Sequence, residues 1–204
     1  MTLSKEETEL CKIFYKNGAD KCLKILHSYS PAYNEIFKDH RQEIKSLLEI
    51  GVGSKAVMKG IVGDAYAPGA SLRSWKEYFP NAEIFGIDYD SSVLFQEERI
   101  SCFYGDQSSV ESLNEAIKKI KNFTRDENFL FDVIIDDGSH VKNHMVLTYN
   151  FLKQFLKPGG LYIIEDIKRV DLNSFIEICD QNMKIEYIHR GINEWDDFVG
   201  YRRK

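Results

Sequence analysis

The chain has 204 residues, of which 32 are acidic and 27 basic, and a formal net charge of -5. This balance argues against a surface that coats nucleic acid, and the apolar runs fall short of the roughly 20 residues that a membrane span needs. The acidic start MTLSKEETEL lacks the pattern of a signal peptide. We therefore expect one cytoplasmic domain over residues 1–204, with neither nucleic acid nor membrane as a partner.

The N-terminal segment of the chain has the periodicity of a helix. Residues 4–43 carry apolar side chains at near-helical spacing, and Ser30-Pro31 interrupts them. Proline disfavours helix in the residue before it and suits the first turn of the helix after it. We expect residues 1–43 to form a helical lid on a core spanning residues 44–204. The apolar and aromatic residues of these helices would suit a homo-oligomer surface, although the sequence leaves the oligomeric state open.

From residue 46 onward, predicted strands alternate with predicted helices. The strands are expected at residues 46–53, 82–90, 100–106, 131–138, 161–166, 184–190 and 197–203. The helices are expected at residues 71–79, 108–123, 142–157 and 171–183. Such alternation indicates an α/β fold, with a mostly parallel sheet covered by helices on both faces. Ligands bind such sheets at the carboxyl ends of the strands, so the residues found there carry the functional information.

The first strand ends in Glu49 and the glycines of Gly51-Val52-Gly53. These glycines would let the backbone approach a ligand closely, or would simply make a tight turn. A complete GxGxxG motif is absent, because Ser54, Lys55 and Ala56 follow. The layout therefore resembles a dinucleotide-binding unit without its pyrophosphate signature.

The next two strands end in residues that suit a nucleoside. Asp88 could accept hydrogen bonds from both hydroxyls of a ribose, while Asp90 and the serines after it would cap the following segment. Asp106 and Gln107 follow the third strand, and their carboxylate and amide groups suit the edge of an adenine. Each of these residues alone is weak support for a nucleotide site.

Acidic residues end the fourth and fifth strands. Asp136 and Asp137 close one, and Glu165 and Asp166 close the other. Parallel neighbours lie about 4.8 Å apart, so these carboxylates should converge and repel unless something positive lies among them. A divalent cation with oxygen ligands would relieve the repulsion. The alternative is that some of them face solvent or cap helices.

His140 follows Asp137 in the turn before the next helix. Its imidazole could remove a proton from a substrate hydroxyl that a metal has acidified. His144 lies one helical turn further on and could support it, while ordinary surface histidines are the alternative for both. We interpret His27 as structural, and Trp195, Asp196 and Asp197 as a solvated turn.

Several segments together resemble the class I S-adenosylmethionine-dependent methyltransferases. More narrowly, they resemble the metal-dependent sugar O-methyltransferases typified by the macrolide enzymes that act on mycinamicin and macrocin. The resemblance spans residues 20–168 and rests on LLEIGVG, PGASLRSWKEYFPNAEIFGID, YGDQ, FDVIIDDGSH and LKPGGLYIIED. It implies a Rossmann-like fold with a seven-stranded sheet, mostly parallel, whose last strand is reversed.

The resemblance also implies S-adenosylmethionine and a divalent metal, magnesium or manganese, as cofactors. Asp137, Glu165 and Asp166 would hold the metal, and His140 would be the general base, so that His140 and Asp137 are the expected catalytic residues. The residues expected at the cofactor are Glu49, Gly51, Ser71, Asp88, Asp106, Gln107, Asp136 and, in the segment HSYSPAY, Tyr29. Tyr33 of that segment is a second candidate for contacting cofactor or substrate.

The activity implied is methyl transfer to a sugar hydroxyl, on a nucleotide-linked or surface-polysaccharide sugar. The chain is short for the macrolide enzymes, which modestly favours a simple sugar or sugar nucleotide as the partner. Residues 54–68 depart from the family pattern, and we expect a loop there that closes over the cofactor. Two alternatives stay open: a catechol-type metal-dependent O-methyltransferase, and a nucleotide-binding protein without catalysis.

Overall fold

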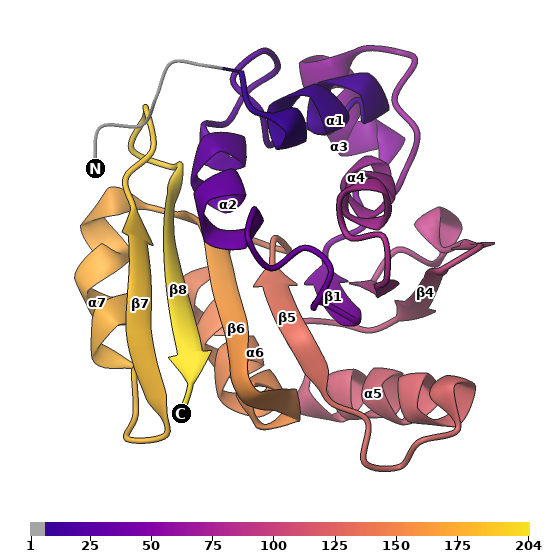
Figure 1. The fold of residues 1–204 in the computed structure, drawn as a ribbon, viewed down its shortest axis with the longest axis vertical. Helices are drawn as coiled ribbons and strands as arrows, with labels where there is room; N and C mark the ends of the chain where they lie inside the picture. The colour runs from indigo at the N-terminus through magenta and orange to yellow at the C-terminus, as the bar shows by residue number, and fades with distance from the viewer. Residues whose placement is uncertain (1–6) are drawn as a thin grey trace.

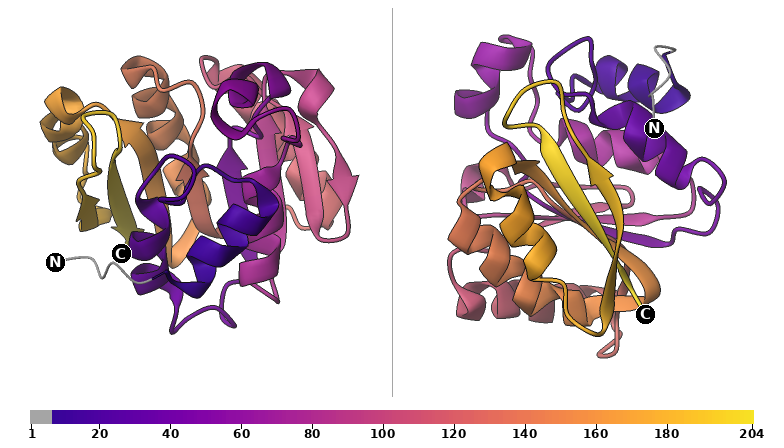
Figure 2. Two further views of the ribbon diagram at one scale, coloured as in Figure 1. Left: turned by 90° about the horizontal axis from the view of Figure 1, so that it is seen from above. Right: turned by 90° about the vertical axis from the view of Figure 1, so that its left-hand side faces the viewer.

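The computed structural model describes residues 7–204 as one sheet with helices on both faces (Figures 1 and 2). The helices are α1 (Glu9–Asn17), α2 (Tyr29–Phe37), α3 (Lys55–Val62), α4 (Ala70–Tyr78), α5 (Val110–Thr124), α6 (Lys142–Leu152) and α7 (Leu172–Glu177). The strands are β1 (Ser46–Ile50), β2 (Glu83–Asp88), β3 (Gln96–Glu97), β4 (Ile100–Tyr104), β5 (Phe131–Asp136), β6 (Leu156–Ile167), β7 (Met183–His189) and β8 (Asp197–Arg203). Among these helices, none is both long and apolar enough to cross a membrane.

The strands lie in the order β3-β4-β2-β1-β5-β6-β8-β7. Strands β4, β2, β1, β5 and β6 pair in parallel, while β8 runs antiparallel to both β6 and β7. The α/β class and the reversed last strand are therefore confirmed. The sheet has eight strands rather than seven because the two-residue β3 pairs with the edge strand β4.

Each face of the sheet has its own core. Successive residues of a strand point to opposite faces, so the fully buried Leu47 and Leu48 of β1 belong to different clusters. One cluster joins the sheet to α1, α2 and α4, and the other joins it to α5, α6 and α7. Burial on both faces explains why the central strands read as nearly continuous apolar runs.

The N-terminal segment forms two short helices with non-helical residues 18–28 between them. Pro31 lies in the first turn of α2, as predicted, and Gly18 ends α1 in the left-handed conformation with φ of 73°. The apolar side chains of these helices pack inside the chain. Phe14, for example, meets Trp75 of α4 edge to face, with ring centroids 4.9 Å apart. This burial removes most of the apolar surface that we had expected to be available for a homo-oligomer.

The prediction of a loop over residues 54–68 is wrong for its first half, which forms α3. Ser54 caps the helix by accepting a hydrogen bond from the Val57 amide at 3.3 Å. Gly63 follows the last turn with φ of 98°. The insertion thus places a short helix, rather than an irregular loop, beside the carboxyl end of β1.

Candidate active site

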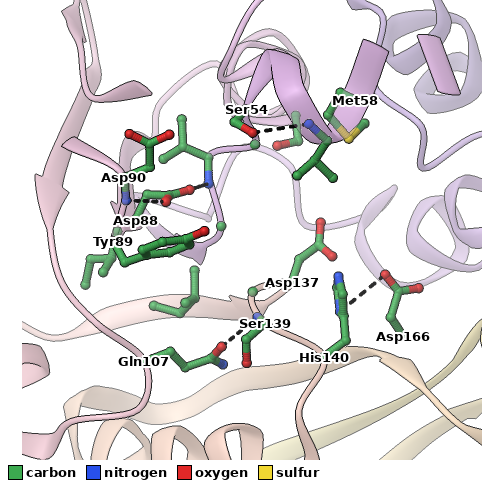
Figure 3. A pocket seen from close by; sticks show the side chains of 18 of the residues that line it. Ser54, Met58, Asp88, Tyr89, Asp90, Gln107, Asp137, Ser139, His140 and Asp166 are labelled. Carbon is green, nitrogen blue, oxygen red and sulfur yellow. Dashed lines mark hydrogen bonds and ion pairs between the residues drawn. The ribbon is translucent and has the colours of Figure 1, made fainter. Parts of the chain in front are cut away.

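A cavity of about 720 Å³ opens at the carboxyl ends of the parallel strands (Figure 3). Its wall comes from the turns after β1, β2, β4, β5 and β6, from α3, and from residues 19, 20 and 27 of the N-terminal segment. This volume is within the usual range for a cofactor or substrate site. Of the predicted residues, Gly51, Ser71, Asp88, Asp106, Gln107, Asp137, His140 and Asp166 line it. Glu49, Asp136, Glu165 and Tyr29 do not.

The turn after β1 depends on a glycine. Gly51 has φ of 96°, and a Cβ there would lie 2.1 Å from the carbonyl oxygen of Asp137. Only glycine therefore allows the turns after β1 and β5 to come this close. Asp88 holds the same region, because its carboxylate accepts hydrogen bonds from the amides of Val52 at 2.8 Å and Asp90 at 2.9 Å. Each carboxylate oxygen has a further lone pair, so Asp88 can still accept from a ligand.

The turn after β4 is joined to the turn after β5 by one side chain. The Gln107 amide donates to Asp136, and its oxygen accepts from the Ser139 amide at 2.8 Å. Asp136 is fully buried, and this burial raises the pKa of its carboxyl group to about 8. The group is therefore mostly neutral at pH 7. Its position behind Gln107 makes it a support for the cavity wall rather than a direct cofactor contact.

Glu49 also lies behind the wall. Its Oε2 accepts a hydrogen bond from the Ser71 hydroxyl at 2.9 Å, and it is Ser71 that reaches the cavity. Burial raises the pKa of Glu49 to about 7. Tyr89, which we did not predict, lines the cavity with 74% of its surface exposed. Figure 3 shows its ring beside Asp88, where a flat base could stack on it.

Asp137, His140 and Asp166 meet at the other side of the cavity in Figure 3. Nδ1 of His140 lies 3.6 Å from Oδ2 of Asp166, and each of the three residues offers an atom within 4.8 Å of the others. Both His140 and Asp166 have positive φ, 54° and 51° respectively. Such backbone is unusual outside glycine and is found preferentially at functional sites. Two carboxylates and an imidazole form a donor set that a divalent cation could use.

Glu165 does not share this position. Glu165 faces inward whereas Asp166 faces the cavity. β6 is irregular at this point, because its register shifts between Ile164 and Ile167 and Asp166 has positive φ. Its side chain is fully buried, accepting hydrogen bonds from the Lys21 ammonium and the Tyr33 hydroxyl. The structure therefore brings two of the three predicted metal ligands to the cavity, and ligation by Glu165 stays a prediction.

Lys21 is the residue that the sequence analysis missed. Its ammonium is 1% exposed and lies 2.5 Å from Oδ2 of Asp137 and 3.2 Å from Oε1 of Glu49, in addition to its contact with Glu165. Burial alone would lower the pKa of Lys21, but these three carboxyl groups hold it well above its ordinary value. Lys21 lies in a non-helical segment with no recognisable motif. The only signal was indirect: a buried acidic cluster requires a positive partner.

The tyrosines of α2 support the acidic residues and do not contact the cavity. The Tyr29 hydroxyl donates to Oδ1 of Asp166 at 2.5 Å and accepts from the Asp166 amide at 3.1 Å. Tyr33 binds Glu165. Both rings are fully buried, and the contact that Tyr29 makes here is with Asp166, so its contact with the cofactor stays a prediction.

His27 lines the cavity, contrary to its interpretation as a purely structural histidine. Its Nδ1 lies 2.9 Å from Oδ1 of Asp196, and its ring stacks on Tyr29 with centroids 4.9 Å apart. Asp196 and Asp197 are buried, which contradicts the expected solvated turn. Asp197 pairs with Arg169, whereas Trp195 is exposed, as expected.

His144 also lines the cavity, but it does not support His140 as expected. Its Nδ1 lies 3.0 Å from the hydroxyl of Ser139.

The sequence of the chain is similar to several characterised O-methyltransferases, although no family model matches it. It is 36% identical over 143 residues to mycinamicin VI 2''-O-methyltransferase of Micromonospora griseorubida, covering 70% of this chain and 32% of the relative. It is 34% identical over 142 residues to demethylmacrocin O-methyltransferase of Streptomyces fradiae, with the same coverage. A third relative, 8-demethyl-8-alpha-L-rhamnosyl tetracenomycin-C 2'-O-methyltransferase of Streptomyces olivaceus, is 33% identical over 159 residues, which are 78% of this chain and 38% of the relative.

Solved structures agree with these matches. The MycE methyltransferase of the mycinamycin biosynthetic pathway, in complex with Mg, SAH and mycinamycin VI, superposes with a TM-score of 0.69 at 28% identity. The superposition covers 96% of this chain and 55% of that one. The chain thus has the fold of the class I S-adenosylmethionine-dependent methyltransferases. Within this class the chain is related to the mycinamicin, macrocin and tetracenomycin O-methyltransferases, and it spans about a third of the length of these curated relatives.

Proposed function

We propose that the protein transfers a methyl group from S-adenosylmethionine to a sugar hydroxyl with the help of a divalent metal. The observation that carries this proposal is the meeting of Asp137, His140 and Asp166 at the wall of a cavity that Asp88 also lines. One part of the cavity can thus hold a nucleoside and another can activate a hydroxyl. The relatives named above are O-methyltransferases by name.

The cofactor would lie along the turns after β1, β2 and β4. Asp88 would accept hydrogen bonds from the ribose, and Tyr89 would stack on the adenine, with Asp106 near its edge. Gly51 would leave room for the backbone to approach the methionine part, near Ser71. Glu49 and Asp136 would keep these residues in place from behind, and Gln107 would join the turns after β4 and β5 at the cavity wall.

His140 would accept the proton of the acceptor hydroxyl. With Nδ1 turned toward Asp166, the other ring nitrogen is the one available to take that proton. Asp137 and Asp166 would hold the metal, which when bound would acidify and orient the hydroxyl. Glu165 could join them only by leaving Lys21 and Tyr33.

The acceptor that the relatives favour is a sugar of a small glycosylated natural product. One relative is named for a rhamnosyl tetracenomycin and another for olivosyl-oleandolide. Support of this kind is lacking for a surface polysaccharide or a nucleotide-linked sugar. A catechol would be gripped by aromatic rings, whereas the wall around His140 carries Asp20, His27 and Asp166. That polar wall suits a sugar with several hydroxyls.

The test is a screen of glycosides and nucleotide sugars with S-adenosylmethionine and magnesium, read as a mass gain of one methylene unit. Reactions without S-adenosylmethionine and reactions with EDTA are the controls. We expect a product that depends on both cofactors. Full activity in EDTA would contradict the role of the metal, and methylation of catechols but no sugar would contradict the acceptor.

A further inference from the structure

The carboxyl groups at the acidic side of the cavity are divided into two parts in the structure. The inner part consists of Glu49 and Glu165, which are fully buried and absent from the cavity wall. The outer part consists of Asp137 and Asp166, which face the cavity together with His140 (Figure 3). Asp137 belongs to both parts, because its Oδ2 also contacts the Lys21 ammonium at 2.5 Å.

The Lys21 ammonium occupies the inner part. A lysine ammonium has three hydrogen-bond donors, and here three carboxyl groups surround it: Glu49, Asp137 and Glu165. The second oxygen of Glu165 accepts from the Tyr33 hydroxyl. Both oxygens of Glu165 therefore have partners, and the positive charge that the crowded carboxyl groups require is supplied by the chain itself.

We propose that Lys21 is a built-in cation that keeps Glu165 out of the coordination of a divalent metal, so that Asp137 and Asp166 hold the metal from the cavity side. This inference rests on the metal site of the proposed function. It follows from the contacts of Glu165 and from the repulsion between two cations that would share Asp137. Lys21 is thus a positioning residue that weakens metal binding and limits it to the outer carboxylates.

The first test measures Mn²⁺ binding to the cofactor-free protein by electron paramagnetic resonance. Glu165→Gln preserves the size of the side chain and an oxygen for Lys21, and we expect it to change the Mn²⁺ dissociation constant by less than about twofold. Asp166→Asn should weaken binding at least about tenfold. A tenfold loss in Glu165→Gln would overturn the inference while leaving the proposed function intact.

The second test removes the ammonium with Lys21→Met, which keeps the length of the side chain. We expect Mn²⁺ to bind about tenfold more tightly or better, and we expect Glu165→Gln in the same chain to cancel that gain. Lys24→Met is the matched control, because Lys24 lies in the same segment, is 52% exposed, and pairs only with Glu7 among the described residues. Unchanged or weaker Mn²⁺ binding in folded Lys21→Met would overturn the inference.

Circular dichroism and thermal melting establish whether each variant is folded. If Lys21→Met does not fold without metal, Glu165→Gln alone decides the question, since it leaves the ammonium in place. Failure of the proposed function has a separate signature, namely no methyl transfer from S-adenosylmethionine to any sugar acceptor by the unmodified chain.

Discussion

The two sides of the cavity are built from different kinds of contact. On the cofactor side, Asp88 and Gln107 bind the backbone of neighbouring strand ends within the α/β core. On the acidic side, Lys21, Tyr29 and Tyr33 bind residues 116 to 144 positions away in the sequence. The cofactor side is therefore formed within the α/β core, by the turns of the sheet together with α3 and the start of α4. The acidic side is complete only when the N-terminal segment packs on the sheet.

The largest effect should come from the acidic side. His140→Ala removes the proposed base, and we expect turnover to fall about 10²- to 10⁴-fold. Affinity for S-adenosylmethionine, measured by calorimetry, should stay within about twofold, because His140 does not support the turns that hold the cofactor. His144→Ala is the control, with a loss of turnover below about fivefold. Equal losses in both variants would assign the base to another group.

On the cofactor side, Asp88→Asn should weaken cofactor binding and leave metal binding intact. The substitution removes a charged acceptor for the ribose and for the amides of Val52 and Asp90. We expect affinity for S-adenosylmethionine to fall about ten- to a hundredfold. Mn²⁺ binding, which needs Asp137 and Asp166, should be unchanged. A simultaneous loss of Mn²⁺ binding would contradict the separation of the cavity into two sides that are held by different contacts.

Tyr29→Phe tests the link between α2 and Asp166. The variant keeps the ring that stacks on His27 and loses the hydroxyl that binds the Asp166 carboxylate and amide. We expect a loss of about tenfold in turnover, with cofactor affinity unchanged. Tyr78→Phe is the control, since the Tyr78 hydroxyl has only a 3.4 Å contact with Asn34 among the described residues. Turnover equal to that of the unmodified protein would contradict a positioning role for Tyr29.

The smallest effect concerns the pH dependence of stability. Asp136 has a pKa of about 8 in the folded state, above its ordinary value of 3.8, so the folded state holds a proton that the unfolded chain releases between these values. Its contribution to stability is complete below about pH 4 and is lost as the pH rises through 8. The free energy of unfolding, measured by urea denaturation, should therefore decrease between pH 6 and pH 7 in the unmodified protein. In Asp136→Asn, which has no carboxyl group to titrate, this decrease should be about 1 kcal/mol smaller. Identical decreases would mean that Asp136 is charged when folded.

Most of the core could be predicted because its signals are local. Alternating apolar residues and turn residues predict the strands, and Gly51 and Asp88 follow directly from the positions at which two of them end. The acidic side could be predicted only in part. The sequence shows that Glu165 and Asp166 are adjacent, but it does not show the register shift in β6 and the left-handed backbone at Asp166, where only Asp166 turns to the cavity.

Residues 18–28 could not be placed from the sequence. The near-helical spacing of apolar residues predicts helix there, and that prediction is wrong, because what fixes Lys21 and His27 is contact with carboxylates far away in the chain. Helix α3 was missed for a related reason. Its eight residues are too few for a clear periodicity, and the glycine within it favours interpretation as a loop.

The left-handed backbone at His140 and Asp166 restricts which amino acids can stand at these two positions. Besides glycine, the residues that enter this conformation most readily are asparagine, aspartate and histidine, while β-branched side chains are strongly disfavoured. A library randomised at both positions should therefore return few folded variants outside this set. The main chain thus selects for the same small group of side chains that can transfer a proton or bind a cation.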